Sequence, residues 1–214
     1  MANMELEFSK VRNLIFDLGG VIINIDFDRT YNALARLADL SYEETLSFVK
    51  KEDLFYRFET GRLDEKGFFS LVRSSLCPGR DEEDVRQAWN ALLMDIPRER
   101  IELLTRLRKK YRLYLLSNTN FTHILEVNNI LSRNCGVPDL KDLFDKVYYS
   151  YEIDMVKPDV GIYRHVCEDS RLNPEETVFL DDMPPNLEGA SHAGLLTLHV
   201  QPSPNSIIEL LKNA

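Results

Sequence analysis

The sequence has few residues that could build a disulfide framework or a zinc site. Its 214 residues include three cysteines and four histidines. Cys77, Cys135 and Cys167 are odd in number and widely spaced, and the histidines do not show a metal-ligand spacing. We therefore expect three reduced structural thiols, as in a cytoplasmic protein.

The sequence also lacks long hydrophobic runs and an excess of positive charge. No apolar run approaches the roughly 20 residues of a membrane span, and the opening stretch MANMELEFSKVRN has no apolar segment of the kind found in signal peptides. Lys and Arg number 26 against 35 Asp and Glu, which gives a net charge of −9. This balance argues against nucleic acid and anionic membranes as partners. A small phosphorylated ligand is still compatible with it, if the local site supplies N–H groups, cations or metal.

Five short segments rich in β-forming residues are separated by helix-length stretches. This alternation predicts βαβ units around a parallel sheet that is covered by helices on both faces, and hence an α/β fold. The expected strands lie within 14–25, 114–117, 146–150, 177–182 and 195–200.

A long stretch between the first two strands has a helical pattern only. Apolar residues recur at i, i+3, i+4 and i+7 in several places, as in Val85, Ala88, Trp89 and Leu92. With breaks at 40–41, 61 and 77–80, this pattern predicts a bundle of three or four helices. We expect residues 26–95 to form this inserted bundle, and residues 1–25 and 96–214 to form the core domain.

Polar residues follow four of the expected strands at the edge where a parallel sheet binds its ligands. They are Asp17, the run 117–120, Lys157, and the pair Asp181 and Asp182. Simpler interpretations exist: Asp17 could cap a turn, the run 117–120 could cap the next helix, and Lys157 could be a surface lysine before a proline. Two adjacent carboxylates repel each other unless a cation lies between them, so the acidic pair predicts a Mg²⁺ site.

These groups together are typical of phosphoryl transfer. Asp17 would attack phosphorus and form an aspartyl-phosphate. Mg²⁺ would reduce the repulsion between this carboxylate and the phosphate. Ser117, backbone N–H groups and Lys157 would hold the phosphate oxygens as charge moves onto them.

Four segments in this order resemble the haloacid dehalogenase (HAD) superfamily of phosphohydrolases. They are FDLGGV, LLSNTN, VKP and VFLDDMPPNLEGA, with a helical cap between the first two. The resemblance covers nearly the whole chain and is closest to the α-D-glucose-1-phosphate phosphatase branch. It implies a Rossmann-like core, Mg²⁺ dependence and a phosphatase acting on a small phosphorylated metabolite, such as a sugar 1-phosphate. The dehalogenases of the superfamily need no metal, and the acidic pair is our reason for expecting a phosphatase instead.

The resemblance also implies individual roles. Asp17 resembles the nucleophile and a metal ligand, the carbonyl of Gly19 a second ligand, and Asp182 a third, with Asp181 at or behind the metal. The remaining matched positions imply phosphate binders, a lysine that bridges phosphate and nucleophile, and a loop-fixing residue; these are Ser117, Asn118, Lys157 and Asn186.

One family residue is missing. The usual pattern has a second aspartate two residues after the nucleophile, which protonates the leaving group and then activates water, but Gly19 occupies this place. Such acid–base catalysis contributes about 10²–10⁴-fold. The substrate could need less help, Asp26 or Glu59 could substitute, or the chain could be a slow or inactive phosphometabolite-binding scaffold. For Asp26 a solvated turn, and for Glu59 a helix surface, are the simpler interpretations.

The inserted bundle should decide specificity, because its position in the sequence places it over the strand ends. We expect polar and aromatic residues around Gly61 to contact the substrate, or alternatively to form a solvated helix end; these are Tyr56, Arg57, Glu59 and Arg62. The pocket should suit a metabolite. The sequence leaves the exact substrate, the acceptor and the oligomeric state open.

Overall fold

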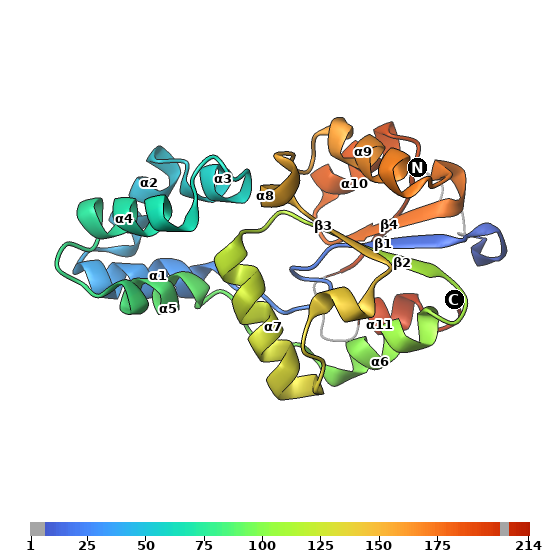
Figure 1. Cartoon of the computed structure of the whole chain (residues 1–214), viewed down its shortest axis with the longest axis horizontal. Coiled ribbons are helices and arrows are strands. Elements are labelled where there is room, and N and C mark those ends of the chain that lie inside the picture. Colours follow the sequence, from blue (N-terminus) through green and yellow to red (C-terminus); the bar gives the residue numbers. More distant parts are fainter. Residues whose placement is uncertain (1–6, 202–205) are drawn as a thin grey trace.

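A five-stranded parallel sheet forms the centre of the protein (Figure 1). The computed structural model describes residues 7–201 and 206–214, so residues 1–6 and 202–205 of the predicted core lie outside the described residues. The sheet has the order β3-β2-β1-β4-β5, and every neighbouring pair is parallel. The α/β fold expected from the sequence is confirmed. The strands are β1 (Asn13–Phe16), β2 (Arg112–Ser117), β3 (Lys146–Tyr149), β4 (Thr177–Asp181) and β5 (Leu196–His199).

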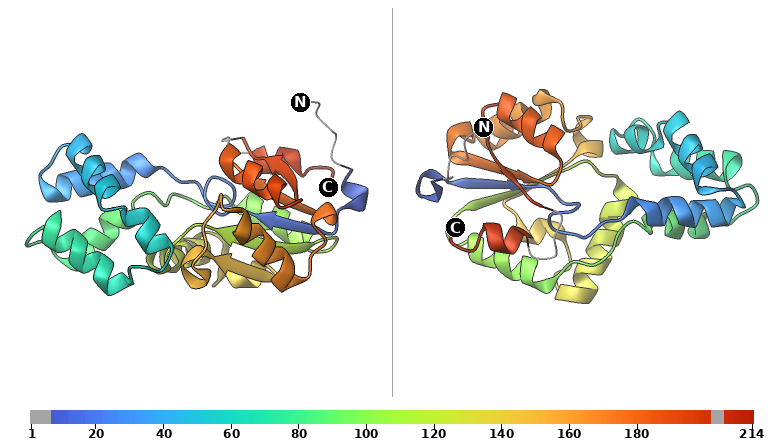
Figure 2. Two further views of the ribbon diagram at one scale, coloured as in Figure 1. Left: turned by 90° about the horizontal axis from the view of Figure 1, so that it is seen from above. Right: turned by 180° about the vertical axis from the view of Figure 1, so that it is seen from behind.

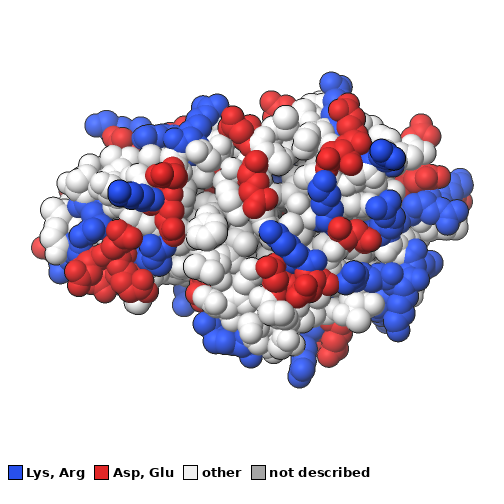
Figure 3. Space-filling view, in the orientation of Figure 1, with Lys and Arg blue, Asp and Glu red and all other residues white. Residues whose placement is uncertain are grey.

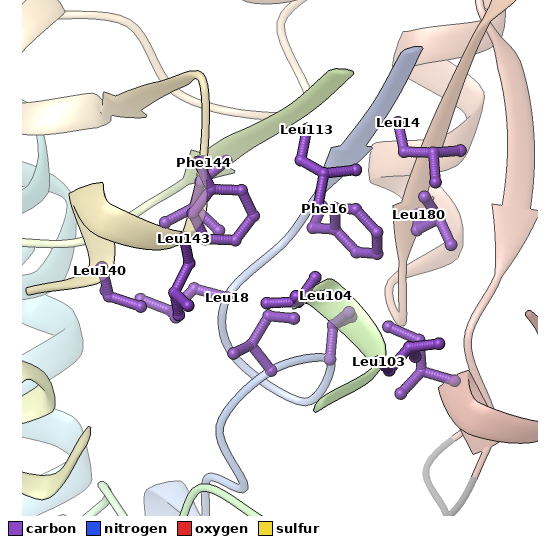
Figure 4. Close-up of a cluster of buried hydrophobic side chains, with 14 of the residues drawn as sticks. Leu14, Phe16, Leu18, Leu103, Leu104, Leu113, Leu140, Leu143, Phe144 and Leu180 are labelled. Atoms are coloured by element: carbon purple, nitrogen blue, oxygen red, sulfur yellow. The ribbon is translucent and has the colours of Figure 1, made fainter. Parts of the chain in front are cut away.

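Helices cover both faces of the sheet because alternate strand residues point to opposite sides. Leu14 and Phe16 of β1 share a buried cluster with α6 (Arg98–Leu107), α7 (Phe121–Cys135) and α11 (Ser206–Leu210). Figure 4 shows part of this cluster, including Leu103 and Leu104 of α6. Ile15 points to the other face and packs with α9 (Val160–Ser170) and α10 (Pro184–His192). Short turns of helix complete the core: α8 (Ser150–Ile153) and 3₁₀ segments at Phe8–Lys10, Leu140–Leu143 and Pro174–Glu176.

The first expected strand is shorter than the sequence suggested. We expected a β-rich segment through residue 25, but β1 ends at Phe16. The backbone N–H groups of Ile22 and Ile23 both donate to the carbonyl of Leu18, so the chain turns here. Gly20 has φ +72°, a left-handed conformation that favours glycine. Hydrophobic residues 21–23 are buried by this turn and not by a strand, which is why their apolar character was misleading.

A separate group of helices lies beyond the carboxyl ends of the strands, and we call it the helical insertion (Figures 1 and 2). It has its own apolar core, in which Phe58 stacks on Phe68 at 4.2 Å between ring centroids and Trp89 packs beside them. The described residues contain five helices here, so the expectation of three or four was wrong. They are α1 (Phe27–Ala38), α2 (Tyr42–Lys51), α3 (Leu54–Glu59), α4 (Glu65–Ser75) and α5 (Glu82–Asn90).

Helices α2 and α3 have the weakest sequence signals of the five. Only Thr45 and Val49 of α2 are buried, and α3 is six residues long. The expected breaks do separate helices: Ser41 caps α2, and Gly61 follows the end of α3.

Two linkers join the helical insertion to the core, and they run side by side. Ile25 and Leu93 form an antiparallel bridge. The N–H of Asp26 donates to Leu92 O (2.9 Å), and that of Met94 donates to Asn24 O (3.0 Å). The paired linkers hold the helical insertion at the carboxyl end of β1. The exact division of the chain at residues 26 and 95 stays a prediction.

Charged side chains of both signs are interspersed on the face shown in Figure 3, with a group of acidic side chains over the far end of the helical insertion. Among the helices in the described part of the chain, none combines the length and apolar character needed to cross a membrane.

Candidate active site

The first functional side chain lies where β1 ends in the middle of the sheet. Asp17 follows β1 directly, and its N–H donates to Leu180 O of β4 (2.9 Å). The chain leaves β1 toward β2 on one side and later enters β4 on the other, so a crevice forms between the two strand ends. Asp17 therefore lies at the position where open α/β sheets bind ligands.

Lys157 joins Asp17 to the end of β4. Its Nζ donates to Asp17 Oδ1 and to Asp181 Oδ2, each at 2.7 Å. The exposed fraction is 4% for Lys157, 8% for Asp17 and 0% for Asp181, so water does little to screen this group. A buried ammonium between two carboxylates fixes both side chains at the strand ends.

Asn118 holds the Lys157 backbone in place. Its Oδ1 accepts from the N–H of Lys157, and its Nδ2 donates to the carbonyl of Lys157, both at 2.9 Å. We expected Asn118 to bind phosphate, which stays a prediction: the residue lines the larger cavity, while its side-chain amide is hydrogen-bonded to the loop after β3. Nothing in the sequence pattern predicted this pairing, because the two loops are 39 residues apart.

Asp181 is surrounded by donors. Besides Lys157, the N–H of Met183 donates to Oδ1 (2.7 Å), and Asn186 Nδ2 donates to both oxygens (3.0 Å each). The Lys157 ammonium therefore reduces the repulsion between Asp181 and Asp182. In the sequence analysis we expected only a metal ion to do this. Asn186, expected to fix a loop, binds Asp181 directly. These contacts suit a carboxylate that lies behind a metal and orients Lys157.

Asp182 approaches the turn after β1. A Cβ added to Gly20 would fall 2.5 Å from Asp182 Oδ2, so a larger residue here would force the carboxylate to move. Asp182 is half-buried, and its carbonyl is hydrogen-bonded to His199 Nε2 (3.0 Å). From the sequence we expected a role for the Gly19 carbonyl and no separate role for Gly20.

The three carboxylates form a site that suits a divalent cation. Asp17, Asp181 and Asp182 each offer an oxygen, and these atoms lie within 4.8 Å of one another. Burial raises the pKa of Asp17 to about 7, with Asp181 adding to the rise and Lys157 opposing it. Burial also raises the pKa of Asp182, and Asp181 adds to this. The single ammonium leaves an excess of negative oxygen atoms, which is the environment that Mg²⁺ prefers.

Lys157 stays charged in this environment. Burial acts to lower its pKa, but the charges and hydrogen bonds of Asp17 and Asp181 outweigh burial and raise it. The lysine is therefore a permanent cation beside Asp17.

The strand ends border a cavity that is large enough for a metabolite. It measures about 390 Å³ and is lined by Asp17, Gly19, Lys157 and Asp182 from the core and by Glu59 from the helical insertion. Ser117, which is 3% exposed, also lines it. A smaller cavity of about 60 Å³ shares Gly19, Glu59 and Ser117 and extends toward apolar residues.

Of the residues expected to determine specificity, the structure brings only Glu59 to the cavity. Arg57 donates to Glu52 O (3.3 Å), and the Arg62 guanidinium lies 4.9 Å from the ring centroid of Tyr56. Asp26, a candidate acid, caps α1 by accepting from the N–H of Asp28 (3.0 Å). Its carboxylate is a helix cap and does not line either cavity.

Sequence comparisons relate the chain to a known family of hydrolases. Residues 11–194 match the family model for haloacid dehalogenase-like hydrolases. The chain is 33% identical over 190 residues to a D-ribitol-5-phosphate phosphatase from Bacteroides thetaiotaomicron, covering 87% of this chain and 90% of the relative. A phosphorylated carbohydrates phosphatase from Thermotoga maritima is 28% identical, with 85% and 81% covered.

Solved structures give the same result. A magnesium complex of a HAD family enzyme from B. thetaiotaomicron has a TM-score of 0.81 at 33% identity, covering 92% of this chain and 96% of that chain. A predicted HAD-like family hydrolase from Porphyromonas gingivalis has a TM-score of 0.84 at 30% identity, covering 95% and 97%. With its parallel sheet, its buried aspartate after β1 and a family match that spans most of its length, the chain belongs to the haloacid dehalogenase-like hydrolases.

Proposed function

We propose that this protein is a Mg²⁺-dependent phosphatase of small phosphorylated metabolites that uses Asp17 as its nucleophile. The observation that carries the proposal is the cluster of three carboxylates with the Lys157 ammonium between Asp17 and Asp181. The relatives support it, because two are named as phosphatases of phosphorylated polyols or carbohydrates.

The metal would be held by the carboxylates of Asp17 and Asp182 and the carbonyl of Gly19. When bound, Mg²⁺ supplies positive charge that offsets the repulsion between a carboxylate nucleophile and a phosphate anion. The donor set fits such a hard cation, since it consists of oxygen atoms only.

Residues of the chain would act as the nucleophile, stabilise the phosphate and position these groups. Asp17 attacks phosphorus, and the bond to the leaving oxygen breaks to give an aspartyl-phosphate. Lys157 and Ser117 stabilise the phosphate oxygens as charge moves onto them. Asp181 and Asn118 keep Lys157 in position through the contacts described above. Water then releases inorganic phosphate and restores the Asp17 carboxylate.

The substrate is a sugar or polyol phosphate in this proposal. A sugar 1-phosphate has an anomeric leaving oxygen that needs little protonation, which would suit the glycine at position 19. A polyol 5-phosphate is suggested by the relative from B. thetaiotaomicron. The cavity of about 390 Å³ suits either ligand and is too small for a polymer.

The test is phosphate release from a panel that contains D-ribitol 5-phosphate, glucose 1-phosphate, glucose 6-phosphate and p-nitrophenyl phosphate. We expect Mg²⁺-dependent release that EDTA abolishes reversibly and that Asp17→Asn removes. A preference for glucose 1-phosphate over the 6-phosphate would support the anomeric substrate. Activity that survives both EDTA and Asp17→Asn would contradict the mechanism, and binding without release would identify a scaffold. Release of chloride from a haloacid without metal would instead identify a dehalogenase.

A further inference from the structure

We propose that Glu59 of the helical insertion is the general acid and base that Gly19 cannot supply, an inference that rests on the proposed phosphatase function. The role requires a titratable side chain that lines the same cavity as Asp17, is not committed to other contacts and is held in place. The structure meets each requirement.

The usual position for this group is filled by another side chain. A Cβ added to Gly19 would lie 2.8 Å from Ile25 Cδ1, so the side chain of Ile25 occupies the space that an aspartate would enter. Ile25 also forms the bridge between the two linkers. The core therefore offers an apolar group where the family normally has an acid.

Few titratable groups line the two cavities. Asp17, Asp182 and Lys157 already have roles as nucleophile, metal ligand and phosphate partner. His123 is unavailable, because its ring nitrogens are hydrogen-bonded to Asn120 Nδ2 and the Trp89 carbonyl, and burial lowers its pKa to about 4. Glu59 is the remaining carboxylate among the described residues that line the cavities.

The Glu59 side chain is free to act. Charges on Lys157 and Asp17 influence it, but among the described residues it has no hydrogen-bond or ion-pair partner. A half-buried carboxylate that has no partner and lines a cavity beside Asp17 is a candidate for a functional group. Both cavities reach it, and Asp17 lines the larger one.

The backbone around Glu59 is anchored to the core. Glu59 is the last residue of α3, and Gly61 follows with φ +70°. A Cβ on Gly61 would lie 2.8 Å from the carbonyl of Tyr151 in α8, so the helical insertion contacts the core directly here. On its other side, Phe58 is fixed in the aromatic core of the insertion. Glu59 is thus positioned between two anchored residues, Phe58 and Gly61.

The pKa of Glu59 is suitable for a general acid and base. Burial raises the pKa of Glu59 to about 7, with the Asp17 charge adding to the rise and Lys157 opposing it. An acid with a pKa near the working pH can both give and take a proton.

Glu59 would transfer one proton in each of the two chemical steps. As Asp17 attacks phosphorus and the P–O bond to the leaving group breaks, the Glu59 carboxylic acid gives its proton to the leaving oxygen, which departs as an alcohol. The Glu59 carboxylate then takes a proton from water while the water oxygen attacks the aspartyl-phosphate. The P–O bond to Asp17 breaks, inorganic phosphate leaves, and Glu59 is protonated again.

The test compares leaving groups in Glu59→Gln. With the best alkyl phosphate of the panel, we expect phosphoenzyme formation to slow by about 10²–10⁴-fold, the usual contribution of a general acid. With p-nitrophenyl phosphate, whose leaving group needs no proton, rapid-quench formation of the phosphoenzyme should stay within a few-fold of wild type. Hydrolysis of that phosphoenzyme should slow, so that it accumulates. Glu52→Gln, on the same insertion but outside the cavities, is the matched control and should behave as wild type.

Three results would overturn the inference: unchanged kinetics, an equal loss of phosphoenzyme formation with both substrates, or a raised KM at constant kcat. Far-UV circular dichroism of Glu59→Gln checks that the fold is intact. Failure of the proposed function would look different, because Asp17→Asn would then keep activity or wild type would have none.

Discussion

The Lys157→Met substitution tests the electrostatic arrangement of the site. Methionine keeps most of the side-chain volume but removes the ammonium that contacts Asp17 and Asp181 at 2.7 Å each. Removing one partner of a buried ion pair costs about 3–5 kcal/mol, because the other charge is left uncompensated. We expect the free energy of unfolding to fall by about this amount at pH 8 in EDTA.

The stability lost through Lys157→Met should be smaller at pH 6 than at pH 8. Burial already raises the pKa of Asp17 to about 7, and loss of Lys157 removes the main influence that lowers it. A carboxyl group whose pKa is higher in the folded state than in the unfolded state destabilises the protein progressively as pH rises toward the folded value, by about 1.4 kcal/mol per unit. Asp17 in the variant should therefore be protonated at pH 6, and the deficit should be smaller there than at pH 8.

Urea unfolding followed by far-UV circular dichroism measures the free energy of unfolding at pH 6 and at pH 8. This signal reports on the whole chain, whereas fluorescence of the single tryptophan, Trp89, reports on the helical insertion. Lys146→Met is the control: Lys146 is half-exposed and pairs with Asp169 at the surface, so the same substitution should change stability little. The reasoning would be refuted if Lys157→Met lowered the free energy of unfolding no more than the control does. It would also be refuted if the decrease were the same at both pH values.

Two further predictions concern Gly20 and His123. Gly20→Ala places a Cβ 2.5 Å from Asp182 Oδ2 and should weaken Mg²⁺ binding in calorimetry, whereas Gly79→Ala, with a similar positive φ and open space around it, should not; equal binding in both variants would contradict this. Burial lowers the pKa of His123 to about 4, so the unfolded chain takes up this proton first as pH falls below about 6.5, and stability should decline by about 1.4 kcal/mol per unit from there to about pH 4. An NMR titration of the imidazole checks this, and a His123 pKa near 6.5 would contradict it.

The central part of the site could be predicted from the sequence because sheet geometry determines it. Strands β1, β3 and β4 are parallel, so the residues that follow them meet at one edge wherever they lie in the chain. Asp17, Lys157 and the acidic pair needed only this rule. The resemblance to the HAD superfamily pointed to the same positions.

Contacts between loops could not be predicted in this way. Asn118 binds the Lys157 backbone, and Gly20 makes room for Asp182, through distances that depend on how two loops approach each other. The sequence pattern gives the residue types in each loop but not their separation.

The helical insertion illustrates a second limit. Tyr56, Arg57, Glu59 and Arg62 were grouped because they are close in sequence, yet a short helix distributes neighbouring residues around its axis. Phe55 and Glu59, four residues apart, share the face that lines the smaller cavity. The sequence predicted the break at Gly61 but not the close approach of this glycine to the Tyr151 carbonyl, which positions the end of α3 beside the core.

The most direct test of the account is the position of the divalent cation. Crystals grown with MnCl₂ in place of magnesium would give an anomalous difference peak at the metal. We expect this peak between the carboxylates of Asp17 and Asp182, beside the carbonyl of Gly19. A peak elsewhere, with these two side chains free of metal, would contradict the proposed mechanism.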